Sequence, residues 1–194
     1  MKTIVINADP KRKGINARLM KSALKGAESV GAETQYVDLY KMKISGCRVC
    51  LICKNDDSVC KCYWRDELSP LIEDIFSCDC LLIGVPIFFS QPSSHYMALL
   101  ERLIYSLVSY KSGNKFKGKV NVGLFYTINH PRGYFEKSIK PQLKQSEDLL
   151  EMLVVFRVLG ASGIVSVCVP LLVCGYKTCE IHTGHIQTSL YCII

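Results

Sequence analysis

The sequence lacks the features of several protein classes. It has no internal repeat and no low-complexity tract, so neither a fibrous nor a disordered protein is expected. The N-terminal stretch MKTIVINADP has too short an apolar run for a signal peptide, and no small-residue cleavage site follows it. We therefore expect a cytoplasmic protein.

Uninterrupted apolar runs of membrane length are also missing. Residues 152–174 are nearly long enough to span a bilayer, but Arg157, Gly160, Gly163 and Pro170 divide them. We expect a helix end, a turn and a buried strand in this stretch. No membrane segment is predicted.

Histidine is scarce, and the usual catalytic and nucleotide motifs are absent. None of the four histidines belongs to a recognisable Ser/His/Asp arrangement. The sequence has neither a Walker loop nor a G-x-G-x-x-G fingerprint. We therefore expect a bound cofactor to carry the chemistry, and we assign no catalytic side chain.

Length and composition indicate an ordinary globular protein. The chain has 194 residues, of which 49% are hydrophobic and 21% charged, which suits a single domain over residues 1–194. The net charge of +7 suits anionic cofactors. We interpret the lysines of residues 111–119 as a solvated loop, and we expect no nucleic-acid partner.

Five strand-like stretches are interspersed with amphipathic helical patterns, and all but residues 33–40, which alternate, are short apolar runs. Such runs are typical of strands covered on both faces of a parallel sheet. The five stretches lie at residues 2–7, 33–40, 78–89, 120–129 and 163–169. The pattern predicts an α/β fold, a doubly wound five-stranded parallel sheet with helices on both faces. Ligands of such sheets bind at the carboxyl ends of the strands, which selects loops 8–16, 86–93 and 127–134.

The first of these loops combines positive charge with a helix N-terminus. Free backbone amides and the helix dipole favour a phosphate there. Lys11, Arg12, Lys13 and Asn16 add charge and hydrogen-bond donors, whereas Asp9 opposes an anion unless its carboxylate points away. The alternative is a solvated basic turn.

The second and third loops offer the surroundings of a planar heterocycle. Prolines stiffen the second loop, aromatic side chains give flat apolar surface, and exposed amides could bind a ring edge. These features are typical of a flavin pocket, although the two phenylalanines could simply be strand-end core. His130 is expected to be a surface residue. The candidate flavin contacts are Pro86, Ile87, Phe88, Phe89, Ser90, Thr127 and Asn129, with Tyr134 as a further wall.

Five of the eleven cysteines lie in the segment GCRVCLICKNDDSVCKC, residues 46–62. Cys47, Cys50 and Cys53 run as C-x2-C-x2-C, a compact spacing typical of iron-sulfur clusters. Cys60 and Cys62 are both within reach as a fourth ligand. A four-iron four-sulfur cluster, a zinc site and unliganded or redox-active thiols remain alternatives. The cysteines in apolar runs, Cys78, Cys80 and Cys168, are expected to be core residues.

The order of four motifs resembles a known family. INADPKRKGINARLM, CRVCLICKNDDSVCKCYWRDEL, GVPIFFSQPSSHYMALLERL and LFYTINHP together resemble the flavodoxin-like NAD(P)H-dependent FMN reductases, in particular their iron-sulfur flavoprotein branch. The resemblance covers roughly residues 1–150. It implies FMN, held at its phosphate by the first loop and at its ring by the other two. It also implies a homodimer or higher homo-oligomer.

The resemblance extends to the expected activity. It implies an oxidoreductase that takes a hydride from NAD(P)H onto FMN and passes electrons to a small-molecule or protein acceptor, through a 4Fe-4S cluster in the loop between the second strand and second helix. The alternative is a non-enzymatic flavin-bound electron carrier or sensor. Two positions depart from the family pattern, because Asp9 replaces a serine and Asn16 a threonine. The tail at 175–194 gives no prediction.

Two criteria favour different cysteines as the fourth cluster ligand. Loop closure favours Cys60 slightly, because it needs fewer ordered residues. Alignment with the family favours Cys62, which stands four residues before the acidic pair Asp66 and Glu67. We predict Cys62, with Cys60 as the alternative.

Overall fold

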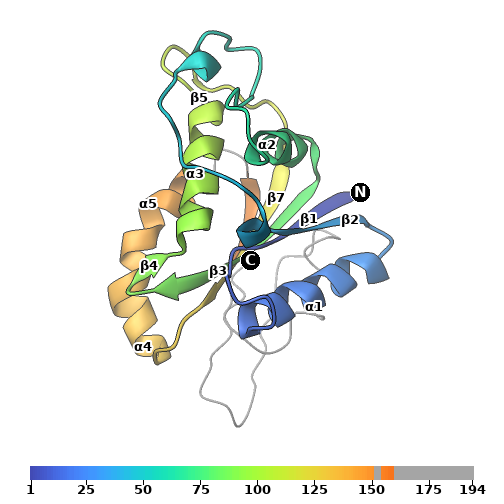
Figure 1. Ribbon diagram of the computed structural model, residues 1–194, viewed down its shortest axis with the longest axis vertical. Coiled ribbons are helices and arrows are strands. Elements are labelled where there is room, and N and C mark those ends of the chain that lie inside the picture. Colours follow the sequence, from blue (N-terminus) through green and yellow to red (C-terminus); the bar gives the residue numbers. More distant parts are fainter. Residues whose placement is uncertain (151–153, 160–194) are drawn as a thin grey trace.

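The computed structural model describes residues 1–150 and 154–159. Within this part, five parallel strands form one sheet in the order β2-β1-β3-β7-β8, and a short strand, β4, pairs antiparallel with β3 (Figure 1). The strands are β1 (Lys2–Asn7), β2 (Glu33–Asp38), β3 (Cys80–Phe88), β4 (Gln91–Pro92), β7 (Val120–Thr127) and β8 (Val154–Leu159). This arrangement confirms the predicted flavodoxin-like doubly wound sheet.

Helices cover both faces of the sheet because alternate strand residues point in opposite directions. Val5 packs with α1 (Ile15–Ser29) on one face. Ile4 and Ile6 belong to the larger core on the other face. That core is completed by α2 (Leu68–Ser77), α3 (Ser94–Leu107) and α5 (Lys140–Leu150). The two cores thus cover both faces of the sheet.

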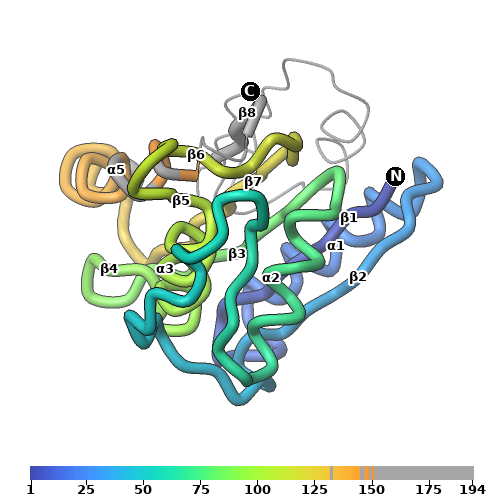
Figure 2. Tube along the Cα trace, turned by 90° about the horizontal axis from the view of Figure 1, so that it is seen from above, coloured from blue at the N-terminus to red at the C-terminus, as the bar shows by residue number. Residues whose placement is uncertain are grey.

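The connections contain several short elements. The 3-10 turns η1 (Leu39–Lys41) and η2 (Ile52–Lys54) lie between β2 and α2, and the strands β5 (Val108–Ser109) and β6 (Gly113–Asn114) form a hairpin after α3. The segment between β2 and α2 contains the clustered cysteines and runs beside α3 and β5 (Figure 2). After β7, α4 (Arg132–Tyr134), the π-helix η3 (Phe135–Ile139) and α5 follow without a break.

The helix end that was expected within residues 152–174 requires a correction. Strand β8 at Val154–Leu159 pairs with β7, with Val120 opposite Val154 and Leu124 opposite Leu159. The sequence pattern had predicted a helix end here, and parallel pairing along an apolar edge overrides that local preference. The predicted strand at 163–169, Cys168 and the tail at 175–194 lie outside the described residues. The single-domain prediction for residues 1–194 therefore stays a prediction.

The remaining sequence-based expectations for the core can be checked directly. Cys78 and Cys80 are buried as predicted, and burial raises the pKa of each thiol to about 12. Such thiols stay protonated and unreactive at neutral pH. In the described part of the chain, no helix combines the length and apolar character needed to cross a membrane.

Candidate functional site

The loop between β1 and α1 is held in shape by its own polar side chains. Asp9 is almost fully buried, and its carboxylate accepts the backbone N–H of Lys11 at 2.8 Å. The backbone N–H of Gly14 donates to the carbonyl oxygen of Lys11 at 2.9 Å, which curls the loop toward α1. Asp9 therefore shapes the backbone of the loop, as aspartate commonly does in turns.

The start of α1 offers groups for an anion. The first turn of a helix leaves its backbone amides without partners inside the helix, and the first turn of α1 contains no acidic residue. Lys11, Arg12 and Lys13 are exposed beside it. The guanidinium of Arg12 lies 4.0 Å from the buried carboxylate of Asp38, so part of its charge is directed toward the end of β2.

Asn16 is buried at the base of this loop. Its side-chain amide donates to Asn7 Oδ1 at 2.8 Å, while its own Oδ1 is buried without a hydrogen-bond partner among the described residues. The space for Asn16 exists because Gly84 faces it from β3. A Cβ at Gly84 would lie 2.8 Å from the Asn16 amide atoms and 2.6 Å from Met20 Cγ. A glycine thus lets α1 approach β3 closely.

A two-residue turn joins β3 to β4 and presents the aromatic side chains. Phe89 and Ser90 have φ angles of 49° and 67°, as in the type I′ turns that connect twisted hairpins. Phe88 is 44% exposed and Phe89 102% exposed. The alternative that these two phenylalanines belong to the core at the end of the strand is therefore wrong. The left-handed backbone at two non-glycine residues is unusual and is often found at binding sites.

This turn borders a hollow of about 640 Å³, a size typical of ligand sites. The hydroxyl groups of Ser90 and Tyr134 lie 3.0 Å apart and join the two sides of the hollow. The rings of His130 and Tyr134 are in contact, with centroids 4.5 Å apart. The lining residues are Ile87, Phe88, Phe89, Ser90, Ile128, Asn129, His130 and Tyr134.

The hollow contains most of the predicted ring contacts but also differs from the prediction. Pro86 and Thr127, paired across β3 and β7, do not line it. His130 is exposed as expected, yet it lines the hollow together with Ile128, which the sequence did not single out. Both follow β7 directly, so their position after a parallel strand was the available signal.

The N-terminus of α3 joins the first two loops. Ser93 is buried, and its hydroxyl donates to the carbonyl oxygen of Ala8 at 2.7 Å. The backbone N–H of Ser93 donates to the carbonyl oxygen of Pro86 at 3.2 Å. This residue therefore fixes the start of α3 against the phosphate-loop candidate and the end of β3.

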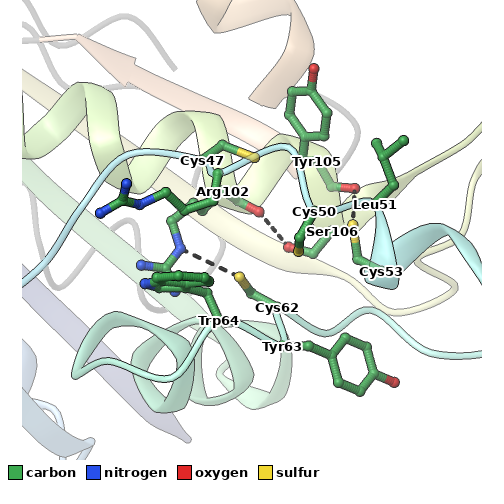
Figure 3. Close-up of a pocket in the computed structure, with 11 residues that line it drawn as sticks. Cys47, Cys50, Leu51, Cys53, Cys62, Tyr63, Trp64, Arg102, Tyr105 and Ser106 are labelled. Carbon is green, nitrogen blue, oxygen red and sulfur yellow. Dashed lines mark hydrogen bonds between the residues drawn. The ribbon is translucent and has the colours of Figure 1, made fainter.

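Four of the five clustered cysteines line one small pocket near the other end of α3 (Figure 3). They are Cys47, Cys50, Cys53 and Cys62, together with Arg102, Tyr105 and Ser106 of the helix. Cys60 does not line this pocket, although it packs against the main core as Cys62 does. Between the first three cysteines, Val49 and Leu51 adopt φ angles of 51° and 57°, which wind the chain tightly.

The individual thiols have different surroundings. Burial raises the pKa of Cys53 and of Cys60, although nearby lysine charges oppose this. The thiol of Cys53 donates to the carbonyl oxygen of Tyr105 at 3.5 Å, and Cys62 Sγ accepts a hydrogen bond from Arg102. In residues 1–150 and 154–159, no three histidine, cysteine or acidic side chains are grouped as a site for one metal ion.

Two lysines anchor the cysteine segment to the rest of the molecule. Lys54 Nζ donates to the carbonyl oxygens of Tyr105 and Val108 and lies over the rings of Tyr105 and Tyr110. Lys115 is 4% exposed, and its ammonium group donates to three backbone carbonyls of the cysteine segment. The expectation of a solvated lysine loop at 111–119 is therefore wrong for Lys115, because these carbonyls replace its hydration.

Comparison with known proteins finds two curated relatives of the chain. An iron-sulfur flavoprotein of Archaeoglobus fulgidus is 22% identical over 145 residues, covering 72% of this chain and 63% of the relative. One of Methanosarcina thermophila is 26% identical over 125 residues, covering 64% of this chain and 62% of the relative. The alignments thus span less than two thirds of either relative.

Solved structures of low sequence identity share the fold. An NAD(P)H:quinone oxidoreductase from Methanothermobacter marburgensis has a TM-score of 0.65 at 15% identity, covering 82% of this chain and 85% of that one. The azoreductase AzrA has a TM-score of 0.61 at 12% identity, covering 82% and 86%. The family model described as NADPH-dependent FMN reductase matches residues 1–163. The chain therefore belongs to the NADPH-dependent FMN reductase family.

Proposed function

We propose that the protein is an FMN-dependent oxidoreductase that accepts a hydride from NAD(P)H and passes electrons on through a 4Fe-4S cluster. The observation that carries the cluster is the shared pocket of Cys47, Cys50, Cys53 and Cys62. Cys60 lies outside it although it is only two residues from Cys62. Membership of the FMN reductase family supports the flavin and its electron donor.

The residues of the first loop fit the phosphate of FMN. The amides at the start of α1 and the exposed side chains of Lys11, Arg12 and Lys13 supply donors and positive charge. Asp9 keeps the loop curled through the Lys11 amide, and its carboxylate is almost fully buried. The unpaired Oδ1 of buried Asn16 is consistent with a polar ligand at this position.

The hollow beside β4 fits the flavin ring. Phe88 and Phe89 offer exposed aromatic surface, and Ser90, Asn129 and Tyr134 offer hydrogen-bonding groups. When bound, the flavin would take up a hydride from NAD(P)H and release the electrons one at a time. The surrounding side chains would orient the ring and exclude water, and none of them needs to act as an acid or base.

Four thiols that line one pocket are the donor set that a four-iron four-sulfur cluster needs. In a cubane cluster each thiolate binds a different iron atom, so the four sulfurs are spread more widely than around zinc. Three cationic groups, from Lys54, Arg102 and Lys115, would offset the negative charge of a thiolate-bound cluster.

We place this activity in the cytoplasm and in a homodimer or higher homo-oligomer, with a small molecule or a protein as electron acceptor. We propose the fully exposed ring of Phe89 at the hairpin tip as a contact for a second copy. Light scattering of the purified protein measures the oligomeric state, and a monomer with bound flavin would contradict the assembly.

The cluster hypothesis is tested by a matched pair of variants. Cys62→Ser and Cys60→Ser make the same chemical change two residues apart. After anaerobic purification of the full chain, Cys62→Ser should lose iron and acid-labile sulfide, whereas Cys60→Ser should retain both. The opposite result would assign Cys60 as the fourth ligand, and absence of iron in the unmutated protein would refute the cluster.

The flavin hypothesis has a separate test. Chromatography of the released cofactor should show FMN, because the loop offers one phosphate site and no dinucleotide fingerprint. Addition of NADPH without oxygen should then bleach the flavin absorbance. Unchanged absorbance with both NADPH and NADH would favour the non-enzymatic carrier or sensor instead.

A further inference from the structure

Arg102 is the most completely enclosed charged side chain beside the cysteine pocket. It is 1% exposed and projects from the C-terminal half of α3. Its Nε donates to Cys62 Sγ at 3.3 Å, and Figure 3 shows this bond across the pocket. A guanidinium keeps its charge in such surroundings, so a fixed positive charge faces one of the four thiols.

The other nitrogens of Arg102 are occupied by groups that lock its orientation. Nη1 donates to the carboxylate of Asp66 at 2.6 Å and to the carbonyl oxygen of Ser45 at 3.2 Å. Nη2 donates to the hydroxyl of Ser69 at 2.7 Å. These partners flank the cysteine segment on both sides, so the planar fork cannot rotate away from Cys62 without breaking bonds at Asp66 and Ser69.

We propose that Arg102 positions Cys62 as the fourth cluster ligand and stabilises the reduced cluster through its Nε–H···Sγ hydrogen bond. This inference rests on the cluster of the proposed function. Reduction adds one electron and hence one negative charge to the cluster. A buried donor that carries a positive charge lowers the free energy of the more negative form, and hydrogen bonds to sulfur are known to shift cluster potentials in this direction.

Arg48 provides the internal comparison. It lines the same pocket and carries the same charge, but it is exposed and its guanidinium lies over the Trp64 ring at 5.2 Å. Charge on an exposed side chain is screened by solvent, whereas Arg102 acts in a poorly hydrated site. Arg48→Gln therefore tests the effect of removing a nearby charge while leaving the bond to Cys62 intact.

The experiment compares the unmutated full chain with Arg102→Gln, Arg102→Lys and Arg48→Gln after anaerobic purification with cluster and flavin. Iron and acid-labile sulfide are measured per chain, and the midpoint potential of the cluster is determined by a redox titration followed by electron paramagnetic resonance. Arg102→Lys keeps the positive charge, but a single ammonium group cannot serve Cys62, Asp66 and Ser69 together. If Arg102→Gln fails to fold, the Arg102→Lys variant still tests the proposal.

We expect Arg102→Gln to disfavour the reduced cluster by about tenfold, a shift of about 59 mV to lower potential for a one-electron couple. Arg102→Lys should shift in the same direction by less, and Arg48→Gln should stay near the unmutated value. Loss of iron confined to the Arg102 variants would also support the positioning role.

Unchanged potentials in fully loaded Arg102 variants, or an equal shift in Arg48→Gln, would overturn the role of Arg102 while leaving the cluster in place. A lack of iron in the unmutated chain would instead remove the cluster, and this inference with it. The two failures are therefore distinguished by the unmutated protein alone.

Discussion

The ammonium group of Lys115 donates a hydrogen bond to the carbonyl oxygen of Cys53 at 2.7 Å, across 62 positions of the sequence. The same group also reaches the carbonyl oxygens of Asp56 and Val59. A single buried side chain of the segment after β6 thus organises the backbone between the third and fourth predicted cluster ligands. These hydrogen bonds let a cation of the protein itself hold the loop.

Lys115→Met should loosen this loop while preserving most of the side-chain volume. The variant loses the ammonium group and leaves three backbone carbonyls without their donor. We expect a loss of about 1.5–3 kcal/mol in the free energy of unfolding, the range for hydrogen bonds to charged groups. Denaturant unfolding of the cluster-free, reduced protein measures this. Lys119→Met is the control, because Lys119 is exposed, and an equal loss in both variants would contradict the role of Lys115.

Asp9 should influence FMN binding in two opposing ways. Its carboxylate shapes the loop through the Lys11 amide, but its negative charge lies in the loop that would receive the phosphate. Asp9→Ser removes the charge and keeps a hydrogen-bond acceptor, whereas Asp9→Ala removes both. We expect Asp9→Ser to bind FMN more tightly than Asp9→Ala, as measured by quenching of flavin fluorescence. Equal affinities would mean that the acceptor is dispensable.

Gly84→Ala should disturb both the core and the phosphate loop. The new Cβ would lie 2.6 Å from Met20 Cγ and 2.8 Å from the Asn16 amide, so α1 must move away from β3. We expect a loss of about 1–3 kcal/mol in the free energy of unfolding and weaker FMN binding. Gly133→Ala serves as the control, because a Cβ there meets nothing within 4 Å. If Gly84→Ala bound FMN with unaltered affinity, the packing of α1 against β3 would not control the phosphate loop, and this prediction would be wrong.

The ion pair between Arg102 and Asp66 should make stability depend on pH in the acid range. Burial pushes the pKa of Asp66 upward, but the hydrogen bond and charge of Arg102 outweigh this and hold the pKa below its ordinary value. Because the folded pKa is depressed, the stabilisation is fully present above the unfolded pKa of about 3.9 and disappears as the pH falls through the folded value.

Asp66→Asn is the variant that tests this linkage. It should be less stable than the unmutated protein at pH 7, since Arg102 then loses its counter-ion in a buried site. The difference in the free energy of unfolding should shrink on acidification below about pH 4, where Asp66 itself becomes protonated. Denaturant titrations between pH 3 and pH 7 would reveal this, and a difference independent of pH would contradict it.

The sequence predicted those parts of the fold that depend on local patterns. The runs at β1, β3 and β7 are apolar on both faces, β2 alternates, and the order of the four leaves few topologies for a parallel sheet. The strand at Val154–Leu159 was missed, because its pattern is compatible with a helix end and only pairing with β7 decides its form.

The sequence predicted which loops form the candidate site. It did not predict the residues far along the chain that contact these loops. Arg102 and Lys115 sit in an amphipathic helix and a lysine-rich stretch, where charged residues are usually solvated. Their burial follows from the cysteine segment, which folds back over them from at least 40 positions away along the chain. No local pattern carries that information. Ile128 and His130 line the hollow opposite the hairpin of Phe89 and Ser90, and only their position directly after β7 pointed to that role.

The helix α3 acts as a spacer of fixed length and phase. Ser93 ties its beginning to the carbonyl oxygen of Ala8, and Arg102 faces the cysteine pocket nine positions later, so about 14 Å of helical rise separates the two attachments. One residue inserted between them would swing Arg102 by about 100° around the helix axis and point its guanidinium away from Cys62. Insertions in the loop after β2 would leave that angle unchanged. The two candidate cofactor sites are therefore free to vary in loop length but not in the number of residues between Ser93 and Arg102.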